Sequence, residues 1–398
     1  MFRNSGEKVE FKVLNAGADS LTEFLELFSN QCFNTCSNTS KEILLPDELT
    51  SGCAIKRFAP DILRLRTQML FNDKTLIRAE LDETIKAVSR YNAATEYDRS
   101  IVASFLCILK LYRVFCHDGG RRDIQEALSI AKALDDDLLL AYVYRQAFFL
   151  DQYSVEERGA FLELARDTFR KHKLNDHAIY CSNNLLIKQL DTGSVNEKQF
   201  IDLKDEAVNT VPGLVGMSHI FNNTGVVHLI KGDVGNAMNY FNEGLKYANS
   251  SGRIIQRIAI KSNQITCMCF GYQNIPESYF YEIFNLIFFN KEALNLPFLT
   301  ARYALNTLVI AARQNKGLGK HLIDTYPIKT LIENALNDNI LGSGQILFQL
   351  NLLKTENDPA FDLLSPAYKI GNIAPLGGAR KEFMEKTGMN FHLFSIWF

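Results

Sequence analysis

The chain has 398 residues, a formal net charge of −2 and 47% hydrophobic residues. This length suffices for one long repeat array or for two to three compact domains. The near-neutral charge provides no overall field that would draw the protein to nucleic acid or to a membrane surface. The sequence has no apolar run of the roughly 18 residues that a spanning helix needs, and residues 1–13 lack the apolar stretch of a signal peptide. These features predict a cytoplasmic protein without a membrane partner.

Residues 1–97 precede the regular part of the chain, and we predict that they form a small N-terminal cap, either α or α+β. Residues 74–90 have the periodicity of a helix. The stretch AIKRFAPDILRLRTQMLF (54–71) fits either a helix that begins after Pro60 or two short strands. A cap of this kind would cover the apolar face that the first unit of a repeat array exposes.

Residues 98–355 have apolar residues at spacings of three and four, which is the period of a helix. Proline is absent between Pro60 and Pro212, and the helical stretches are separated by turn residues such as Lys231-Gly232-Asp233. Short turns between long apolar stretches favour antiparallel helix hairpins. We predict helices at 98–116, 122–134, 137–152, 155–172, 176–191, 196–210, 215–231, 233–250, 253–271, 276–293, 297–315, 328–337 and 343–354.

The stretch FNNTGVVHLIKGDVGNAMNYFNEGL (221–245) gives the most specific pattern in the chain. Gly225 and Ala237 are small enough for two helices to cross, Gly232 permits a tight turn, and Asp233 can cap the second helix. This pattern resembles a tetratricopeptide repeat (TPR). The resemblance implies an all-α fold, a right-handed TPR-like α-solenoid of helix hairpins. The sequence departs from the usual Leu, Ala and Pro of the pattern at Thr224, Gly244 and Asn249.

Four segments align at steps of roughly 39 to 43 residues, namely YCSNNLLIKQL, IFNNTGVVHLI, IKSNQITCMCF and RYALNTLVIAA. They place Asn184, Asn223, Asn263 and Asn306 at the same helix phase, and Arg145 takes the equivalent position one step earlier. These long repeats resemble the expanded repeats of regulators of the MalT and Rap/PlcR types. In those families asparagines at this phase bind the backbone of a peptide.

A row of asparagines has a chemistry that suits an extended peptide, because each side-chain amide offers both a donor and an acceptor. The sequence and the resemblance together predict a peptide or protein partner in the concave groove, held by Arg145, Asn184, Asn223, Asn263 and Asn306. Arg145 could hold a carboxylate through two parallel hydrogen bonds. The alternative is that the amides bond to neighbouring helices and that Arg145 forms a salt bridge within the array.

Residues 356–398 form a predicted C-terminal helical segment, in which IAPLGGARKEFMEKTGMNFHLFSIWF (373–398) resembles half of an AraC-type helix-turn-helix. A recognition-type helix over 379–386 precedes a turn at 387–389 and then an aromatic helix. The resemblance implies that Arg380, Lys381 and Lys386 face DNA. The second helix-turn-helix of that family has no counterpart here. The alternative is a capping helix that buries Phe391, Phe394, Ile396 and Trp397.

The sequence contains no arrangement of nucleophile, base and orienting partner that would indicate an enzyme. Its cysteines and histidines lack the paired spacing of a metal site, and no cofactor motif is present. We therefore predict a non-catalytic regulatory protein with neither a metal nor a cofactor. The alternatives are a transcription regulator, whose repeats sense a ligand and whose C-terminal helices contact DNA, and an assembly scaffold or chaperone. The sequence is also compatible with a homodimer.

Overall fold

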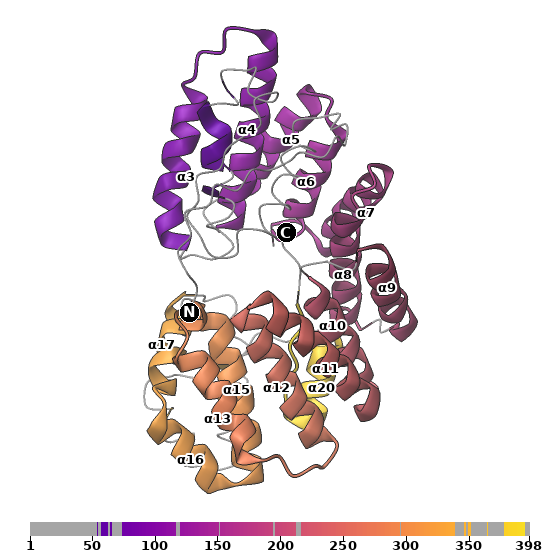
Figure 1. Ribbon diagram of the computed structural model, residues 1–398, viewed down its shortest axis with the longest axis vertical. Helices are drawn as coiled ribbons and strands as arrows, with labels where there is room; N and C mark the ends of the chain where they lie inside the picture. The colour runs from indigo at the N-terminus through magenta and orange to yellow at the C-terminus, as the bar shows by residue number, and fades with distance from the viewer. Residues whose placement is uncertain are drawn as a thin grey trace. The chain divides into compact units, whose positions relative to one another are not determined.

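The computed structural model describes residues 54, 57–62, 64–65, 74–116, 120–150, 152–193, 196–211, 216–294, 296–338, 346–347, 349–351, 364 and 378–394. Within these residues all regular secondary structure is helical (Figure 1), which confirms the predicted all-α class. No helix in the described part of the chain is long and apolar enough to cross a membrane. The chain divides into two compact units, Met1–Leu174 and Asn175–Phe398, so the predicted array over 98–355 has residues in both.

The described part of unit 1 contains five long helices, each of which packs against the next along the chain. Their ends carry capping residues: the Ser154 hydroxyl accepts a hydrogen bond from the Glu157 N–H at 3.1 Å, and the Glu157 carboxylate accepts one from the Ser154 N–H at 2.7 Å. The described residues of 54–65 are helical, which favours helix over two strands for this stretch, although residues before Pro60 are helical too and the predicted start after Pro60 is wrong. The helices are α3 (Lys74–Ser89), α4 (Glu96–Phe115), α5 (Arg121–Ala133), α6 (Asp137–Ala147) and α7 (Val155–Lys171).

Unit 2 begins with pairwise packing in chain order from α8 to α13, and α15 then contacts α12, α13, α16 and α17 (Figure 1). The predicted helices are confirmed to within a few residues, except that the predicted helix 276–293 is divided at residues 289–290 into α13 and α14 and that α16 was not predicted. Most of the predicted helix 343–354 lies outside the described residues. The helices are α8 (Asn175–Asp191), α9 (Glu197–Thr210), α10 (Met217–Ile230), α11 (Val234–Ser251), α12 (Ile254–Phe270), α13 (Glu277–Phe288), α14 (Lys291–Leu294), α15 (Pro297–Gln314), α16 (Lys316–Thr325), α17 (Ile328–Asp338) and α20 (Gly378–Thr387).

The α10–α11 hairpin has the local structure that the 221–245 pattern predicts. A Cβ atom on Gly225 would lie 2.7 Å from the Phe241 ring, so the helices cross where only glycine fits. Gly232 has a φ of 83° in the connecting turn, and Asp233 accepts a hydrogen bond from the Asn236 N–H at 3.2 Å at the start of α11. These contacts fix the crossing of the two helices.

Helix α10 packs against α9, α11 and α12 and is buried around almost its whole circumference. Its buried residues include polar side chains as well as apolar ones, among them Ser218, Asn222, Asn223 and Thr224. A helix that is buried all round normally has an apolar sequence. Because buried polar groups almost always have hydrogen-bond partners, the asparagines of α10 lead to the candidate site.

Candidate functional site: an amide ladder around an extended segment

Four helices of unit 2, α8, α10, α12 and α15, carry asparagine side chains that are 0% exposed. We call this set the amide ladder. An amide that is buried without a partner costs several kcal/mol at the upper end of the measured range, so each member needs donors and acceptors nearby. The ladder consists of Asn183, Asn184, Asn222, Asn223, Asn263 and Asn306.

The partner of the ladder is a segment of the same chain, residues 390–394, which we call the bound segment. It follows α20 and adopts neither helix nor strand. Gly388 turns the chain from α20 into this segment with a φ of 64°, and its N–H donates to the Met384 carbonyl at 2.7 Å. A Cβ atom on Gly388 would lie 2.0 Å from the Arg313 guanidinium, which donates to the Thr387 carbonyl at 2.5 Å. The positive φ therefore favours glycine at this position, whereas the Arg313 guanidinium is the end of a flexible side chain and can move aside.

Two asparagines each bind one residue of the bound segment through both ends of the amide. Asn223 accepts a hydrogen bond from the Phe394 N–H at 2.9 Å and donates to the Phe394 carbonyl at 2.9 Å. Asn263 does the same with His392, at 2.8 Å in each direction. Each amide thus replaces the neighbouring strand that a backbone would have in a sheet.

A third contact of the same kind involves Asn390 and uses two side chains. Asn306 accepts a hydrogen bond from the Asn390 N–H at 2.8 Å, and the Thr266 hydroxyl lies 3.1 Å from the Asn390 carbonyl oxygen. Asn306 also donates to Thr266 Oγ1 at 2.9 Å, which holds the two side chains together. The ladder therefore binds residues 390, 392 and 394 from α15, α12 and α10 in turn.

A second row of asparagines, one residue earlier on α8 and α10, completes the hydrogen bonding. Asn222 donates to the His392 carbonyl at 2.8 Å, and Asn183 donates to the Phe394 carbonyl at 3.0 Å. The same side chains accept from the first row, because Asn263 donates to Asn222 at 2.7 Å and Asn223 donates to Asn183 at 2.9 Å. Each of the two carbonyls thus receives two donors, which is the full capacity of a carbonyl oxygen.

The alternation of contacts follows from the geometry of an extended chain. In such a chain the N–H and C=O of one residue point to the same edge, and those of the next residue point to the other edge. Residues 390, 392 and 394 present both groups to the ladder. Leu393 makes no backbone hydrogen bond to another described residue. The ladder therefore forms hydrogen bonds with the backbone of every second residue.

The side chains of His392 and Phe394 also lie in enclosed surroundings. The His392 ring is 1% exposed, lies edge-on to Tyr303 with ring centres 4.5 Å apart, and has Nε2 at 3.2 Å from the Ser262 hydroxyl. The Phe394 ring stacks on His219 with ring centres 4.5 Å apart and an interplanar angle of 13°. These contacts with flat rings add packing energy that depends on the side chain.

Both histidines at this site are held in the neutral form. Burial lowers the pKa of His219 to about 3, and the positive charge of Arg253 contributes in the same direction. Burial also lowers the pKa of His392 well below its ordinary value, with smaller contributions from Arg302 and Arg380. His219 and His392 are therefore uncharged, although the positively charged side chains of Arg253, Arg302 and Arg380 lie near them.

The structure brings three of the predicted site residues together: Asn223, Asn263 and Asn306 contact one extended chain. Asn184 is buried beside them and accepts a hydrogen bond from Asn183 at 3.3 Å. Arg145 belongs to unit 1, where it is buried on α6 with its guanidinium over the rings of Tyr142 and Phe169. The amides bond from helix to helix, as the alternative predicts, and also to the backbone of the chain's own residues 392 and 394, whereas their binding of a partner stays a prediction.

The residues expected to face DNA lie on α20 in differing surroundings. Lys381 and Lys386 are exposed, whereas Arg380 is buried and donates to the Phe391 carbonyl at 2.7 Å and to Asn390 Oδ1 at 3.2 Å. The predicted aromatic helix after 387–389 is wrong for the described residues, because 389–394 are not helical. Phe391 and Phe394 are buried as the alternative predicted, but from an extended segment, and Ile396 and Trp397 lie outside the described residues.

Asn183, Asn222 and Thr266 belong to the site although they are not among the residues predicted from the sequence. A signal for the first two was present in the doublets Asn183-Asn184 and Asn222-Asn223, because a second amide one residue away lies on an adjacent part of the helix surface. Thr266 gave no signal, since a threonine in an apolar helix usually bonds to its own helix. The single hydrogen of the Thr266 hydroxyl is shared between Ser262 O at 2.9 Å and the Asn390 carbonyl oxygen at 3.1 Å. The sequence also did not identify residues 390–394 as the segment that the asparagines bind.

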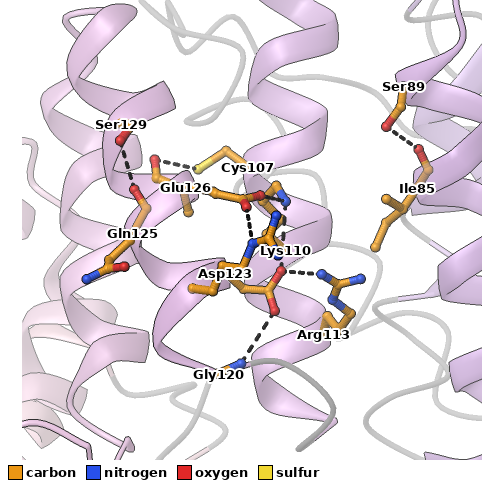
Figure 2. A network of polar contacts seen from close by, with 12 residues as sticks. Ile85, Ser89, Cys107, Lys110, Arg113, Gly120, Asp123, Gln125, Glu126 and Ser129 are labelled. Carbon is orange, nitrogen blue, oxygen red and sulfur yellow. Dashed lines mark hydrogen bonds and ion pairs between the residues drawn. The ribbon is translucent and has the colours of Figure 1, made fainter.

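A second polar cluster lies in unit 1, between α4 and α5 (Figure 2). Asp123 has an ion pair with Arg113, and Glu126 has one with Lys110, which joins the two helices. Cys107 beside them is buried, and burial raises the pKa of its thiol far above the ordinary value, so it is not a nucleophile. The cluster joins two helices and has no ligand-binding geometry. The described residues contain no group of three or more His, Cys, Asp or Glu that could hold a metal ion.

The comparisons with known proteins do not assign the chain to a family. No protein-family model matches the sequence. No curated protein matches it either. The resemblances stated above therefore rest on their own residues, and the function has to be inferred from the chemistry of the amide ladder.

Proposed function

We propose that this protein is a non-catalytic regulator that binds a peptide or a protein segment in the groove of a TPR-like solenoid. The observation that carries the proposal is the pair of two-ended contacts, Asn223 with Phe394 and Asn263 with His392. These contacts involve only backbone groups of the bound segment. Any extended chain without proline at the contacting positions offers the same groups, so the ladder is a general receptor for an extended backbone.

The spacing of the contacts supports a concave position for the ladder. Alternate residues of an extended chain are about 6.6–6.8 Å apart. Packed helices are commonly about 8–10 Å apart between their axes. Successive contacts come from α10, α12 and α15, and α12 packs against both of the others. Side chains that converge to a spacing shorter than that of their helices favour the inner side of a curved stack.

The regulatory mechanism follows from the number of helices that one peptide joins. The bound segment is hydrogen-bonded to α8, α10, α12 and α15 at once. A ligand that bonds to all four favours the curvature in which the amides match its backbone, and it shifts the population toward that curvature. The change in curvature would be passed to a partner protein that binds elsewhere on the solenoid.

The test uses a library of labelled decapeptides of random sequence. The library is panned against the full chain carrying His392→Pro, which removes one N–H from the chain's own segment and so weakens its hold on the ladder. A counter-screen uses the same chain with the additional change Asn263→Ala. Peptides retained by the first protein and lost from the second support the proposal. Retention of the same peptides by both proteins, or retention of none by either, would contradict it.

A further inference from the structure

The bound segment shows which side chains the ladder region accommodates. The position of His392 is enclosed by Tyr303 and Ser262, which lie on α15 and α12, and the position of Phe394 is covered by His219 of α10. These partners belong to the ladder helices, so they would remain in place for another ligand. The side chain at position 391 is different, because its partners Phe383 and Arg380 both come from α20.

The charge around these positions limits the ligand further. Side chains at both positions are almost fully buried, and a buried charge without a partner is strongly unfavourable. Arg302 and Arg380 lie near position 392, and Arg253 lies near His219. A cationic side chain at either position would meet positive charge as well as the cost of burial. Neutral flat rings, by contrast, reproduce the contacts that the bound segment makes.

The bound segment competes with any external peptide because it belongs to the same chain. A tethered ligand acts at an effective concentration that is about millimolar for short flexible linkers. An external peptide must therefore either bind more tightly than the segment or meet a chain in which the segment is weakened. The bound segment can be weakened selectively, because the N–H of Phe394 is bonded to the ladder and the N–H of Leu393 is not bonded to a described residue.

We infer that the ligand of the amide ladder is an extended peptide resembling residues 389–394, with neutral flat rings at the positions of His392 and Phe394, and that it binds by replacing the chain's own segment. This inference rests on the proposed function and adds the ligand's chemistry and its competition with the bound segment. The protein would then be held closed by its own segment until such a peptide arrives.

The experiment measures fluorescence anisotropy of a labelled peptide with the sequence GMNFHLFS, residues 388–395. Three full-length proteins are compared: the unchanged chain, Phe394→Pro and Leu393→Pro. Phe394→Pro removes an N–H that the ladder binds, whereas Leu393→Pro removes one that it does not bind, and proline in either place is compatible with an extended chain. Phe394→Pro should bind the peptide at least about tenfold more tightly than the unchanged chain and Leu393→Pro do, because its own segment is held more weakly.

Modified peptides then test register and side chains separately. N-methylation at the Phe394 position keeps the ring and removes the N–H, and we expect it to weaken binding about tenfold, whereas N-methylation at the Leu393 position should have little effect. Peptides with lysine at the His392 position or at the Phe394 position should also bind at least about tenfold more weakly. Because the same order of peptides is expected with the unchanged chain at high peptide concentration, the comparison does not depend on the folding of a variant.

The outcomes separate the inference from the proposed function. If the charged peptides bind as well as the parent peptide while the N-methyl effect keeps its register, the ladder binds backbone and the ligand chemistry inferred here is wrong. If all three proteins bind the peptide equally, the competition with the bound segment is wrong. If none of the proteins binds any of the peptides at millimolar concentration, the proposed function falls together with the inference.

Discussion

Replacing Asn223 by alanine removes the side chain that joins α10 to the bound segment and to α8. Four hydrogen bonds are lost. Asn223 accepts from the Phe394 N–H and donates to the Phe394 carbonyl and to Asn183 Oδ1, each at 2.9 Å, and it accepts from the Asn222 side-chain amide at 3.2 Å. The Phe394 carbonyl keeps the bond from Asn183 at 3.0 Å, but the buried Phe394 N–H loses its acceptor. Loss of the amide oxygen therefore destabilises the fold more than loss of the amide nitrogen.

The magnitude follows from these contacts. A buried donor left without an acceptor costs about 1–3 kcal/mol, and an ordinary hydrogen bond contributes about 0.5–1.5 kcal/mol. We expect Asn223→Ala to lower the free energy of unfolding of the transition that includes unit 2 by about 2–4 kcal/mol. Detachment of the bound segment is the alternative to leaving the Phe394 N–H buried, so hydrogen exchange at His392 and Phe394 should become faster in the variant.

The assay is urea unfolding followed by far-ultraviolet circular dichroism, combined with hydrogen exchange measured on fragments that contain residues 390–394. The matched control is Asn239→Ala on the exposed face of α11, which should change the free energy of unfolding by no more than about 0.5 kcal/mol. An Asn223→Ala protein with the stability of the control and unchanged exchange in the bound segment would refute the hydrogen-bond reasoning.

Two further predictions concern the hairpin and the histidines. Gly225→Ala places a Cβ atom 2.7 Å from the Phe241 ring and should cost about 1–3 kcal/mol in thermal unfolding, whereas Gly235→Ala meets no atom within 4 Å and should stabilise by about 0.5–1 kcal/mol; equal shifts in the two would contradict the crossing. His219 and His392 have lowered pKa values when buried, so the unfolded chain binds more protons below about pH 6.5. Stability should fall as the pH drops from about 7 to 5, by up to about 1.4 kcal/mol per pH unit for each histidine, and a flat profile in urea titrations would count against their burial.

Much of the helical structure could be predicted because local sequence determines it. The crossing at Gly225, the turn at Gly232 and the cap at Asp233 each follow from the conformational properties of one residue. The shared phase of Asn223 and Asn263 was also visible, since it depends only on spacing along the chain. These features need no knowledge of distant residues.

The occupant of the ladder could not be predicted, because the contacts use backbone groups that every residue has. Asn223 and Phe394 are separated by 171 positions, and no side-chain complementarity links them in the sequence. The aromatic stretch after Gly388 was assigned to a helix on its resemblance to a DNA-binding motif. Its backbone groups instead bond to asparagines of other helices, which outweighs the local preference. The burial of Arg380 could not be predicted for the same reason, because its partner is a backbone carbonyl eleven residues later.

The hydrogen bonds of the ladder depend on the spacing between the helices that carry it. The contacts on α10, α12 and α15 fall between 2.8 and 3.1 Å, and hydrogen bonds of this type weaken beyond about 3.2 Å. Asparagine has a short side chain, so it cannot follow a helix that moves away by more than a fraction of an ångström. A movement that separates adjacent helices by about 1 Å would therefore break successive contacts together. Under the proposed function, a peptide that keeps all of these contacts intact would hold the helices at one spacing, and this dependence would couple ligand binding to the curvature of the proposed solenoid.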